Sequence, residues 1–163
     1  MKRILVVYHT MTGGTLQMAQ AAADGAGREP GVEVQLRAAA ATGAEALLAS
    51  DAYLFATPEN LAAMSGVMKD FFDRTYYAVL DRLQGRPYAI LVCAGSDGSN
   101  AVRQIERIAL GWRLKPMADP IIVCTQAQTP DEIQRPKQIG AVDRLRCEEL
   151  GATLAAGVAL GIF

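Results

Sequence analysis

Three threonines and two glycines stand together in the segment Thr10-Met11-Thr12-Gly13-Gly14-Thr15, here called the Thr/Gly loop. It follows an apolar run at residues 4–8 and precedes a helix-compatible run at residues 16–22. A loop between a buried strand and a helix start presents unpaired backbone N–H groups and the positive end of a helix dipole to an anion. The glycines allow close approach and the hydroxyls add donors. The loop is therefore predicted to bind a phosphate through neutral donors, since it contains no Lys or Arg.

Two well-known nucleotide-binding loops do not match this segment. The chain lacks G-x-G-x-x-G after its first strand, which argues against a dinucleotide loop, and it lacks the G-x-x-x-x-G-K-[ST] of a P-loop. Thr- and Gly-rich loops between strands and helices are also common without any ligand. Composition alone leaves both interpretations open, and the later loops have to decide between them.

Several ionisable residues near the predicted loops could do chemistry. His9 could help to bind phosphate or donate to a substrate, or it could be satisfied by backbone groups. Glu59 could hydrogen-bond to a ligand as an acid or simply point to water. Lys69 and Asp73 have the i, i+4 spacing of an ion pair on a solvated helix face, and Arg74 is expected to cap or pair nearby. We therefore assign no catalytic side chain from the sequence.

The three cysteines, Cys93, Cys124 and Cys147, have no C-x-x-C spacing, and the chain has a single histidine. A zinc site is not expected from this set, and no metal ligand is assigned. Cys93 and Cys124 end apolar runs, so both are expected to be buried and inert. Reduced cysteines and the lack of a secretory signal pattern are consistent with a cytoplasmic protein.

The elements that would position these residues alternate along the chain. Strands are predicted at residues 3–8, 32–36, 52–56, 88–94 and 120–124. Pro58 is expected to end the third strand. Helices are predicted at residues 14–26, 65–77 (extending toward 83), 99–110 and from 130 or 136 to 156, with a short one around 44–49. In the last helix, Ile139, Val142, Leu145, Leu150 and Leu154 are expected to face inward.

Such alternation predicts one α/β domain over residues 1–163, with a parallel sheet covered by helices on both faces. In a flavodoxin-like three-layer sandwich with strand order 2-1-3-4-5, the loops after strands one, three and four meet at one crevice beyond the carboxyl ends of the strands. These are the Thr/Gly loop, the loop beginning at Thr57 and the loop beginning at Gly95. Their convergence strengthens the phosphate interpretation.

The register T-x-T-G-x-T after the first strand resembles the loop with which flavodoxins hold the 5′-phosphate of FMN. Residues 57–74, with Thr57-Pro58-Glu59-Asn60-Leu61 and Met64-Ser65-Gly66 followed by a Lys69-Asp70-Phe71-Phe72-Asp73-Arg74 ending, resemble NAD(P)H-dependent FMN reductases and multimeric flavodoxin-like quinone reductases. The resemblance spans roughly residues 3–100. It implies that FMN contacts Thr10, Met11, Thr12, Gly13, Gly14, Thr15, Pro58, Glu59, Asn60, Leu61, Met64, Ala94, Gly95, Ser96, Asp97 and Gly98. Many relatives carry a small apolar residue and an aromatic where this chain has Glu59-Asn60-Leu61.

The two loops that would flank the flavin ring contain no Phe, Tyr or Trp at residues 58–64 or 94–100. An electron-carrying flavodoxin typically sandwiches its flavin between loop aromatics, whereas an open ring face leaves room for a nicotinamide or a flat acceptor. The leading hypothesis is an FMN-dependent oxidoreductase that passes a hydride from NADH or NADPH, through the flavin, to a quinone or similar small molecule. The alternative is a flavodoxin-type electron carrier without NAD(P)H turnover. A scaffold that has lost flavin also remains open.

Bulk composition limits the partners. The chain has 163 residues and a formal net charge of −1, with 51% hydrophobic and 20% charged residues. That balance gives no reason to expect nucleic acid or an anionic membrane as a partner. The apolar tail at residues 150–163 is shorter than the roughly 20 residues that span a bilayer. The nearly neutral surface and this tail predict a homodimer or homotetramer.

Overall fold

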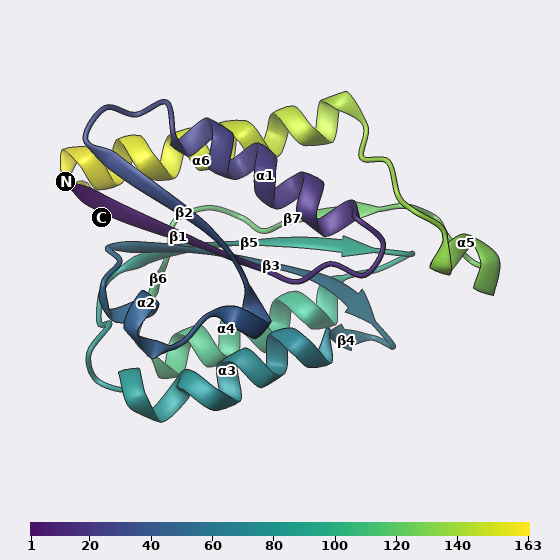
Figure 1. Cartoon of the computed structure of the whole chain (residues 1–163), viewed down its shortest axis with the longest axis horizontal. Helices are drawn as coiled ribbons and strands as arrows, with labels where there is room; N and C mark the ends of the chain where they lie inside the picture. The colour runs from purple at the N-terminus through teal and green to yellow at the C-terminus, as the bar shows by residue number, and fades with distance from the viewer.

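The computed structural model describes all 163 residues as a parallel sheet between two layers of helices (Figure 1). The central strands are short, strongly apolar runs, and each main strand is followed by a helix or a connection that returns to the amino edge. The strands are β1 (Lys2–Tyr8), β2 (Val32–Ala38), β3 (Ala52–Asn60), β4 (Ala63–Met64), β5 (Pro87–Ala94), β6 (Lys115–Pro116) and β7 (Ile121–Cys124). The helices are α1 (Gly14–Ala26), α2 (Ala44–Leu48), α3 (Gly66–Val79), α4 (Ser99–Gly111), α5 (Pro130–Gln134) and α6 (Ala141–Leu160), with a 3₁₀ turn, η1 (Ala39–Ala41).

The sheet has the order β2-β1-β3-β5, with β6 and β7 both pairing along the outer side of β5. All of these pairings are parallel, and only the two-residue β4 is antiparallel, as a hairpin partner of β3. The predicted order 2-1-3-4-5 is therefore confirmed. The fifth position of that order is divided between β6 and β7, and together with the additional strand β4 this raises the strand count from five to seven.

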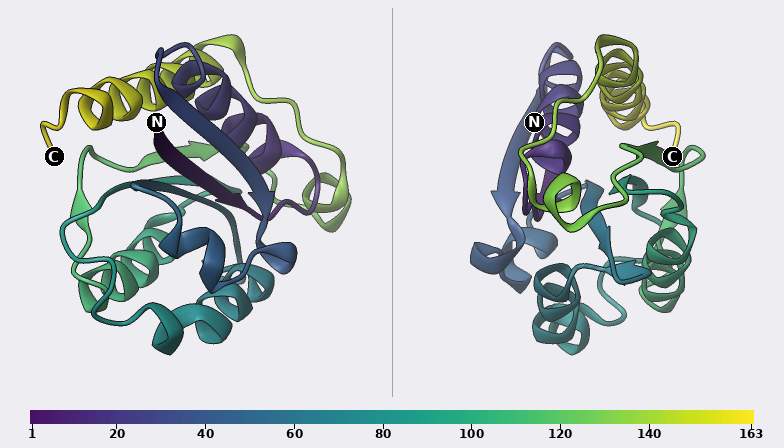
Figure 2. Two further views of the ribbon diagram at one scale, coloured as in Figure 1. Left: turned by 60° about the vertical axis from the view of Figure 1, so that its left-hand side comes forward. Right: turned by 90° about the vertical axis from the view of Figure 1, so that its right-hand side faces the viewer.

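Helices α1 and α6 cover one face of the sheet, and α2, α3 and α4 cover the other (Figures 1 and 2). Alternate residues of β1 supply the two cores: Ile4 and Val6 pack toward α1 and α6, while Leu5 and Val7 pack toward α3 and α4. All four are fully buried. The uninterrupted apolar run of β1 thus reflects a strand that is buried on both faces.

Pro58 does not end β3, contrary to the expectation. The strand continues to Asn60, and Pro58 pairs with Cys93 of β5. On the other side, the pairing with β1 ends where Tyr8 meets Ala56. A proline lacks the N–H that a ladder needs. It is tolerated here because β1 has already left the sheet.

The predicted last helix is wrong in two respects. It consists of two helices, α5 and α6, because residues 135–140 leave the helical path between them. Ile139, Leu150 and Leu154 are buried as expected, but Val142 and Leu145 are 75% and 52% exposed. Neither side chain belongs to the apolar cluster between α6, α1 and the sheet.

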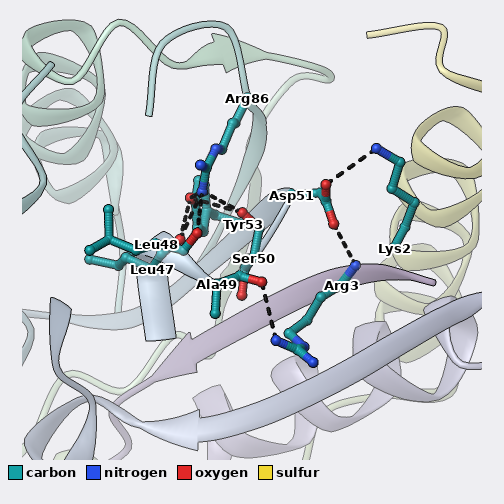
Figure 3. Close-up of polar contacts among 9 residues, drawn as sticks. All are labelled: Lys2, Arg3, Leu47, Leu48, Ala49, Ser50, Asp51, Tyr53 and Arg86. Atoms are coloured by element: carbon teal, nitrogen blue, oxygen red, sulfur yellow. Dashed lines mark hydrogen bonds and ion pairs between the residues drawn. The ribbon is translucent and has the colours of Figure 1, made fainter. Parts of the chain in front are cut away.

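The amino edge of the sheet is closed by polar contacts (Figure 3). Arg86 Nη1 donates to the carbonyls of Leu47 and Leu48 at the end of α2, and to the hydroxyl oxygen of Tyr53 at 2.8 Å. Burial raises the pKa of Tyr53 to about 12, so its hydroxyl remains a donor to Leu47 O at 2.7 Å. Asp51 accepts from the Arg3 backbone N–H at 2.8 Å. These contacts tie the segment before β5 to the end of α2, and the segment before β3 to β1.

None of the helices has the length and apolar character needed to cross a membrane.

Candidate functional site at the carboxyl edge

Three loops leave the sheet side by side at its carboxyl edge. Tyr8, at the end of β1, pairs with Ala56 of β3, and Thr57 of β3 pairs with Val92 of β5. The loops that follow these strands therefore start from neighbouring positions, as the view onto this edge shows (Figure 2, right). The predicted convergence of the Thr/Gly loop, the β3–β4 hairpin and the β5–α4 loop is confirmed by this register.

The Thr/Gly loop ends in the exposed backbone donors of α1. Gly13 adopts φ +93° as the N-cap residue of α1, and its N–H donates to Thr10 Oγ1 at 3.0 Å. The N–H groups of Thr12, Gly14, Thr15 and Leu16 have no acceptor within the chain, and neither have the hydroxyls of Thr12 and Thr15. Four free amides and two free hydroxyls at a helix start form a cradle for an anion. The cradle fits a phosphate group such as that of FMN.

Gly14 lies too close to its surroundings for any other residue. A Cβ at this position would lie 2.7 Å from Cys93 Sγ and 3.3 Å from Lys137 Cβ. The start of α1 is therefore pressed against the end of β5 on one side and against a later segment on the other. This packing fixes where the free amides point.

That later segment, residues 125–139, is here called the strap. Its contacts with the Thr/Gly loop could not be predicted from the sequence, in which Pro130 and Pro136 indicate only possible helix starts. Lys137 N–H donates to Thr12 O at 2.8 Å. Gln17 of α1 clamps the strap twice, because its Nε2 donates to Lys137 O at 2.7 Å and its Oε1 accepts from Ile139 N at 3.0 Å. The pairing joins residues 120 or more apart in sequence, which no local pattern could reveal.

The strap brings a cation near the Thr/Gly loop without aiming it there. The Lys137 ammonium donates to the carbonyls of Glu132, Ile133 and Arg135 at 2.6–2.9 Å, where it stabilises the end of α5. A hollow of about 210 Å³ lies on the same side, lined by Thr125, Gln126, Ala127, Glu132, Arg135, Pro136 and Lys137. The Thr/Gly loop therefore presents only neutral donors, consistent with the sequence interpretation.

The β3–β4 hairpin forms the second wall. Its turn residues Leu61 and Ala62 have φ +50° and +59°, a conformation that L-residues rarely adopt. Leu61 is fully exposed, and Asn60 Nδ2 lies 2.9 Å from the Sδ of Met11 in the Thr/Gly loop. Met64 is buried in the core on the α3 and α4 face. Of the hairpin residues predicted to contact FMN, Pro58 to Leu61 are at least partly exposed at the carboxyl edge, whereas Met64 is buried beneath them.

Glu59 has a role that neither sequence alternative included. Its Oε1 accepts from Gly98 N at 2.9 Å and its Oε2 accepts from Ala101 N at 3.2 Å. The carboxylate is therefore turned toward the start of α4 and is neither a free acid nor directed into solvent. A cap supplied by a residue about 40 positions earlier cannot be recognised by local spacing.

The β5–α4 loop is the third wall. Ser96 and Asp97 are exposed, and their N–H groups have no acceptor within the chain. The Asp97 carboxylate accepts from Ser99 N at 3.2 Å, and hydrogen bonds with Ser99 lower the pKa of Asp97. Gly98 has φ +88°, and a Cβ there would lie 2.6 Å from Ile122 Cγ2. The loop therefore presents backbone donors at its tip and is tightly packed at its base.

His9 is held by Ser65, with 2.9 Å between its Nδ1 and Ser65 Oγ. Burial lowers the pKa of His9 from its ordinary value of 6.5, because desolvation disfavours the imidazolium. The ring is thus neutral at pH 7 and offers no cation to a phosphate. The expected ion pairs on α3 are confirmed: Lys69 Nζ lies 2.6 Å from Asp73 Oδ1, and Arg74 pairs with Asp70.

The cysteines are only partly as predicted. Cys93 is buried, and desolvation raises its pKa to about 11, as expected for an inert thiol. Cys124 is partly exposed, contrary to the expectation, because β7 ends at the open carboxyl edge. Its Sγ lies 3.6 Å from Asp97 O. Burial raises the pKa of this thiol as well, so it is not activated.

The strand order and the anion cradle at the first helix define a flavodoxin-like α/β protein. Solved structures agree on the fold. A flavodoxin from the domain Archaea superposes with a TM-score of 0.78 at 22% identity, covering 96% of this chain and 99% of that one. A flavodoxin, WrbA-like protein from Agrobacterium tumefaciens gives 0.75 at 20% identity, covering 98% and 99%. At these identities the likeness establishes the fold alone.

The model of the NADPH-dependent FMN reductase family matches residues 29–129, more than half of the chain. The chain therefore belongs to this family, and membership implies FMN as its cofactor. A flavodoxin of Aquifex aeolicus (strain VF5) is 36% identical over 60% of the chain and 50% of its own length. An NAD(P)H dehydrogenase (quinone) of Archaeoglobus fulgidus is 33% identical over 55% of the chain and 60% of its own length. The matches span about half to three fifths of these relatives.

Proposed function

We propose that this protein is an FMN-dependent oxidoreductase that takes electrons from NADH or NADPH and passes them to a quinone or a similar small acceptor. The observation that carries the proposal is the Thr/Gly loop, with four free amides and two free hydroxyls at the start of α1. The family match to NADPH-dependent FMN reductases supports the cofactor and the donor. The relatives named NAD(P)H dehydrogenase (quinone) support the acceptor class.

In the proposed arrangement, the Thr/Gly loop holds the 5′-phosphate of FMN. The ring extends toward Pro58 to Leu61 on one side and Ala94 to Gly98 on the other, where Ser96 and Asp97 offer free N–H groups to its polar edge. When bound, FMN supplies the redox chemistry by exchanging two electrons and a proton with a nicotinamide and then with an acceptor. The protein binds the cofactor and leaves a ring face open, since neither wall carries an aromatic side chain.

A flavodoxin-type electron carrier is the second candidate, favoured by the Aquifex aeolicus relative that is named flavodoxin. The two functions differ in turnover. A carrier would bind FMN yet leave NADH and NADPH unoxidised. The bare walls of the crevice favour the enzyme, because a nicotinamide needs access to the ring.

Titration of the apoprotein with FMN and with riboflavin tests the cradle. FMN should bind at least about a hundredfold more tightly, because riboflavin lacks the phosphate that the free donors require. Replacing Thr15 by Val keeps its shape and removes one hydroxyl, so FMN affinity should fall about tenfold, or about 1.4 kcal/mol, while riboflavin binding stays the same. Thr75→Val is the control, because this buried hydroxyl donates to Phe71 O within α3. Equal affinity for the two flavins would contradict the proposed phosphate site.

A further inference from the structure

The carboxylate of Glu59 uses both oxygens on the backbone of another element. Oε1 accepts from Gly98 N at 2.9 Å and Oε2 accepts from Ala101 N at 3.2 Å. Gly98 is the N-cap residue of α4, and because it has no side chain it cannot itself cap the helix. Glu59 therefore supplies two hydrogen-bond acceptors and a negative charge at the positive end of α4, where the Asp97 carboxylate also accepts from Ser99 N.

The start of α4 returns two contacts to the hairpin that carries Glu59. Asn100 Nδ2 donates to Ala62 O at 2.6 Å, and Gln104 Oε1 accepts from Met64 N at 2.8 Å. The β3–β4 hairpin and the start of α4 are thus joined by four hydrogen bonds through three side chains. A change at Glu59 acts on the β5–α4 loop directly, because Gly98 belongs to that loop.

We propose that Glu59 is a positioning residue that keeps the reduction potential of the bound FMN low. The proposal rests on the placement of FMN argued above. A flavin that has taken up two electrons carries negative charge at its polar edge near neutral pH, and free amides close to that edge stabilise the charge. Glu59 occupies two of the N–H groups at the start of α4, those of Gly98 and Ala101. Its own charge opposes the helix dipole that would otherwise favour the reduced form.

Burial separates Glu59 from the other carboxylate at this helix start. Glu59 is partly buried between the hairpin and α4, whereas Asp97 is exposed and its charge is weakened by solvent and salt. The charge that the ring meets is therefore mainly that of Glu59.

The test compares Glu59→Gln with Glu132→Gln in the FMN-loaded protein, equilibrated with a redox dye of known potential. Glu132 is the matched control, because its carboxylate also accepts from two backbone amides, Gln128 N at 2.9 Å and Thr129 N at 3.0 Å, but at α5, which extends beyond the sheet (Figure 1). At the wild-type midpoint, Glu59→Gln should raise the ratio of reduced to oxidised FMN about tenfold, equivalent to about 30 mV for a two-electron couple. Glu132→Gln should leave it unchanged. An unchanged ratio in Glu59→Gln, or the same shift in both variants, would overturn the proposal.

Absorbance of the bound flavin is recorded first, so that the two proposals fail differently. Wild-type protein that takes up no FMN would defeat the proposed function. If FMN is bound but the ratio of reduced to oxidised FMN is the same in the wild type and in Glu59→Gln, only the inference about Glu59 fails. If Glu59→Gln does not bind FMN, the same ratio is measured in Glu59→Asp instead. The shorter side chain keeps its charge but reaches only one of the two amides, so the ratio should rise about threefold, and an unchanged ratio overturns the inference.

Discussion

Single residues at the carboxyl edge act mainly by arranging backbone N–H groups. Gly13 and Gly14 leave the N–H groups at the start of α1 without a side-chain cap, whereas the Glu59 carboxylate accepts from two N–H groups at the start of α4. None of these positions supplies a general acid or base, which suits chemistry carried by a cofactor. His9, the one residue that could titrate near pH 7, is held neutral against Ser65.

The pH dependence of stability tests this view of His9. Because its pKa is lowered on folding, the unfolded chain binds more protons near pH 6.5, and the free energy of unfolding should fall as the pH falls through that value. His9 is the only histidine in the chain, so denaturant unfolding between pH 7.5 and 5.5 should report mainly on this group. The decrease should be smaller in His9→Asn. A variant that loses as much stability as the wild type over this range would contradict the assignment.

The sequence predicted residues whose partners are local and missed those whose partners are distant. The position of the Thr/Gly loop between a strand and a helix could be predicted because strand, glycines and helix follow one another directly. Glu59 was missed as a cap because its amide partners lie about 40 residues later, and the Gln17 clamp was missed because the strap lies 120 residues away. Val142 and Leu145 had helical spacing, yet only the packing of α6 decides that they are exposed.

At the scale of elements, the sheet register brings the three loops together. Of the three, the β3–β4 hairpin has backbone strain in its turn. The β3–β4 hairpin turns through Leu61 and Ala62, both with positive φ, where Asn-Gly is the favoured pair. Pro58 lies on a strand only because β1 ends two residues earlier. The hairpin thus holds a strained turn and a proline at the carboxyl edge of the sheet, and backbone strain commonly accompanies function.

Replacing Leu61-Ala62 by Asn-Gly should relieve this strain. The double variant is expected to raise the free energy of unfolding by roughly 1–2 kcal/mol, measured by urea denaturation. FMN affinity should stay within a few-fold of the wild type, because Leu61 is fully exposed and Glu59 keeps its contacts. Lower stability of the double variant would show that the turn is not strained. Ala62→Gly alone serves as the intermediate control.

At the scale of the whole molecule, the two edges of the sheet have separate tasks. The amino edge is closed by Arg86, Tyr53 and Asp51, while the carboxyl edge carries the free donors. Apolar side chains also remain on the outside, including Val142 at 75% and Leu145 at 52% exposure on α6. Exposed apolar groups on one helix favour association between copies of the chain.

We expect a homodimer or homotetramer in solution, measurable by sedimentation equilibrium. The double variant Val142→Ser and Leu145→Ser should shift the population toward the monomer, because it removes apolar area from the surface of α6. Leu110→Ser, on α4 at the opposite face of the sheet, provides a comparison with similar exposure. A wild-type protein that is monomeric at all concentrations would contradict this expectation.

The central claim is that FMN held at the carboxyl edge exchanges electrons first with NAD(P)H and then with a quinone. The most direct measurement is the visible absorbance of the FMN-loaded protein under anaerobic conditions, first with one equivalent of NADPH or NADH and then with a quinone. We predict that the flavin band bleaches with the nicotinamide and returns with the quinone, each step being stoichiometric. A band that stays unchanged with both nicotinamides, although FMN is bound, would contradict the claim and favour the electron carrier.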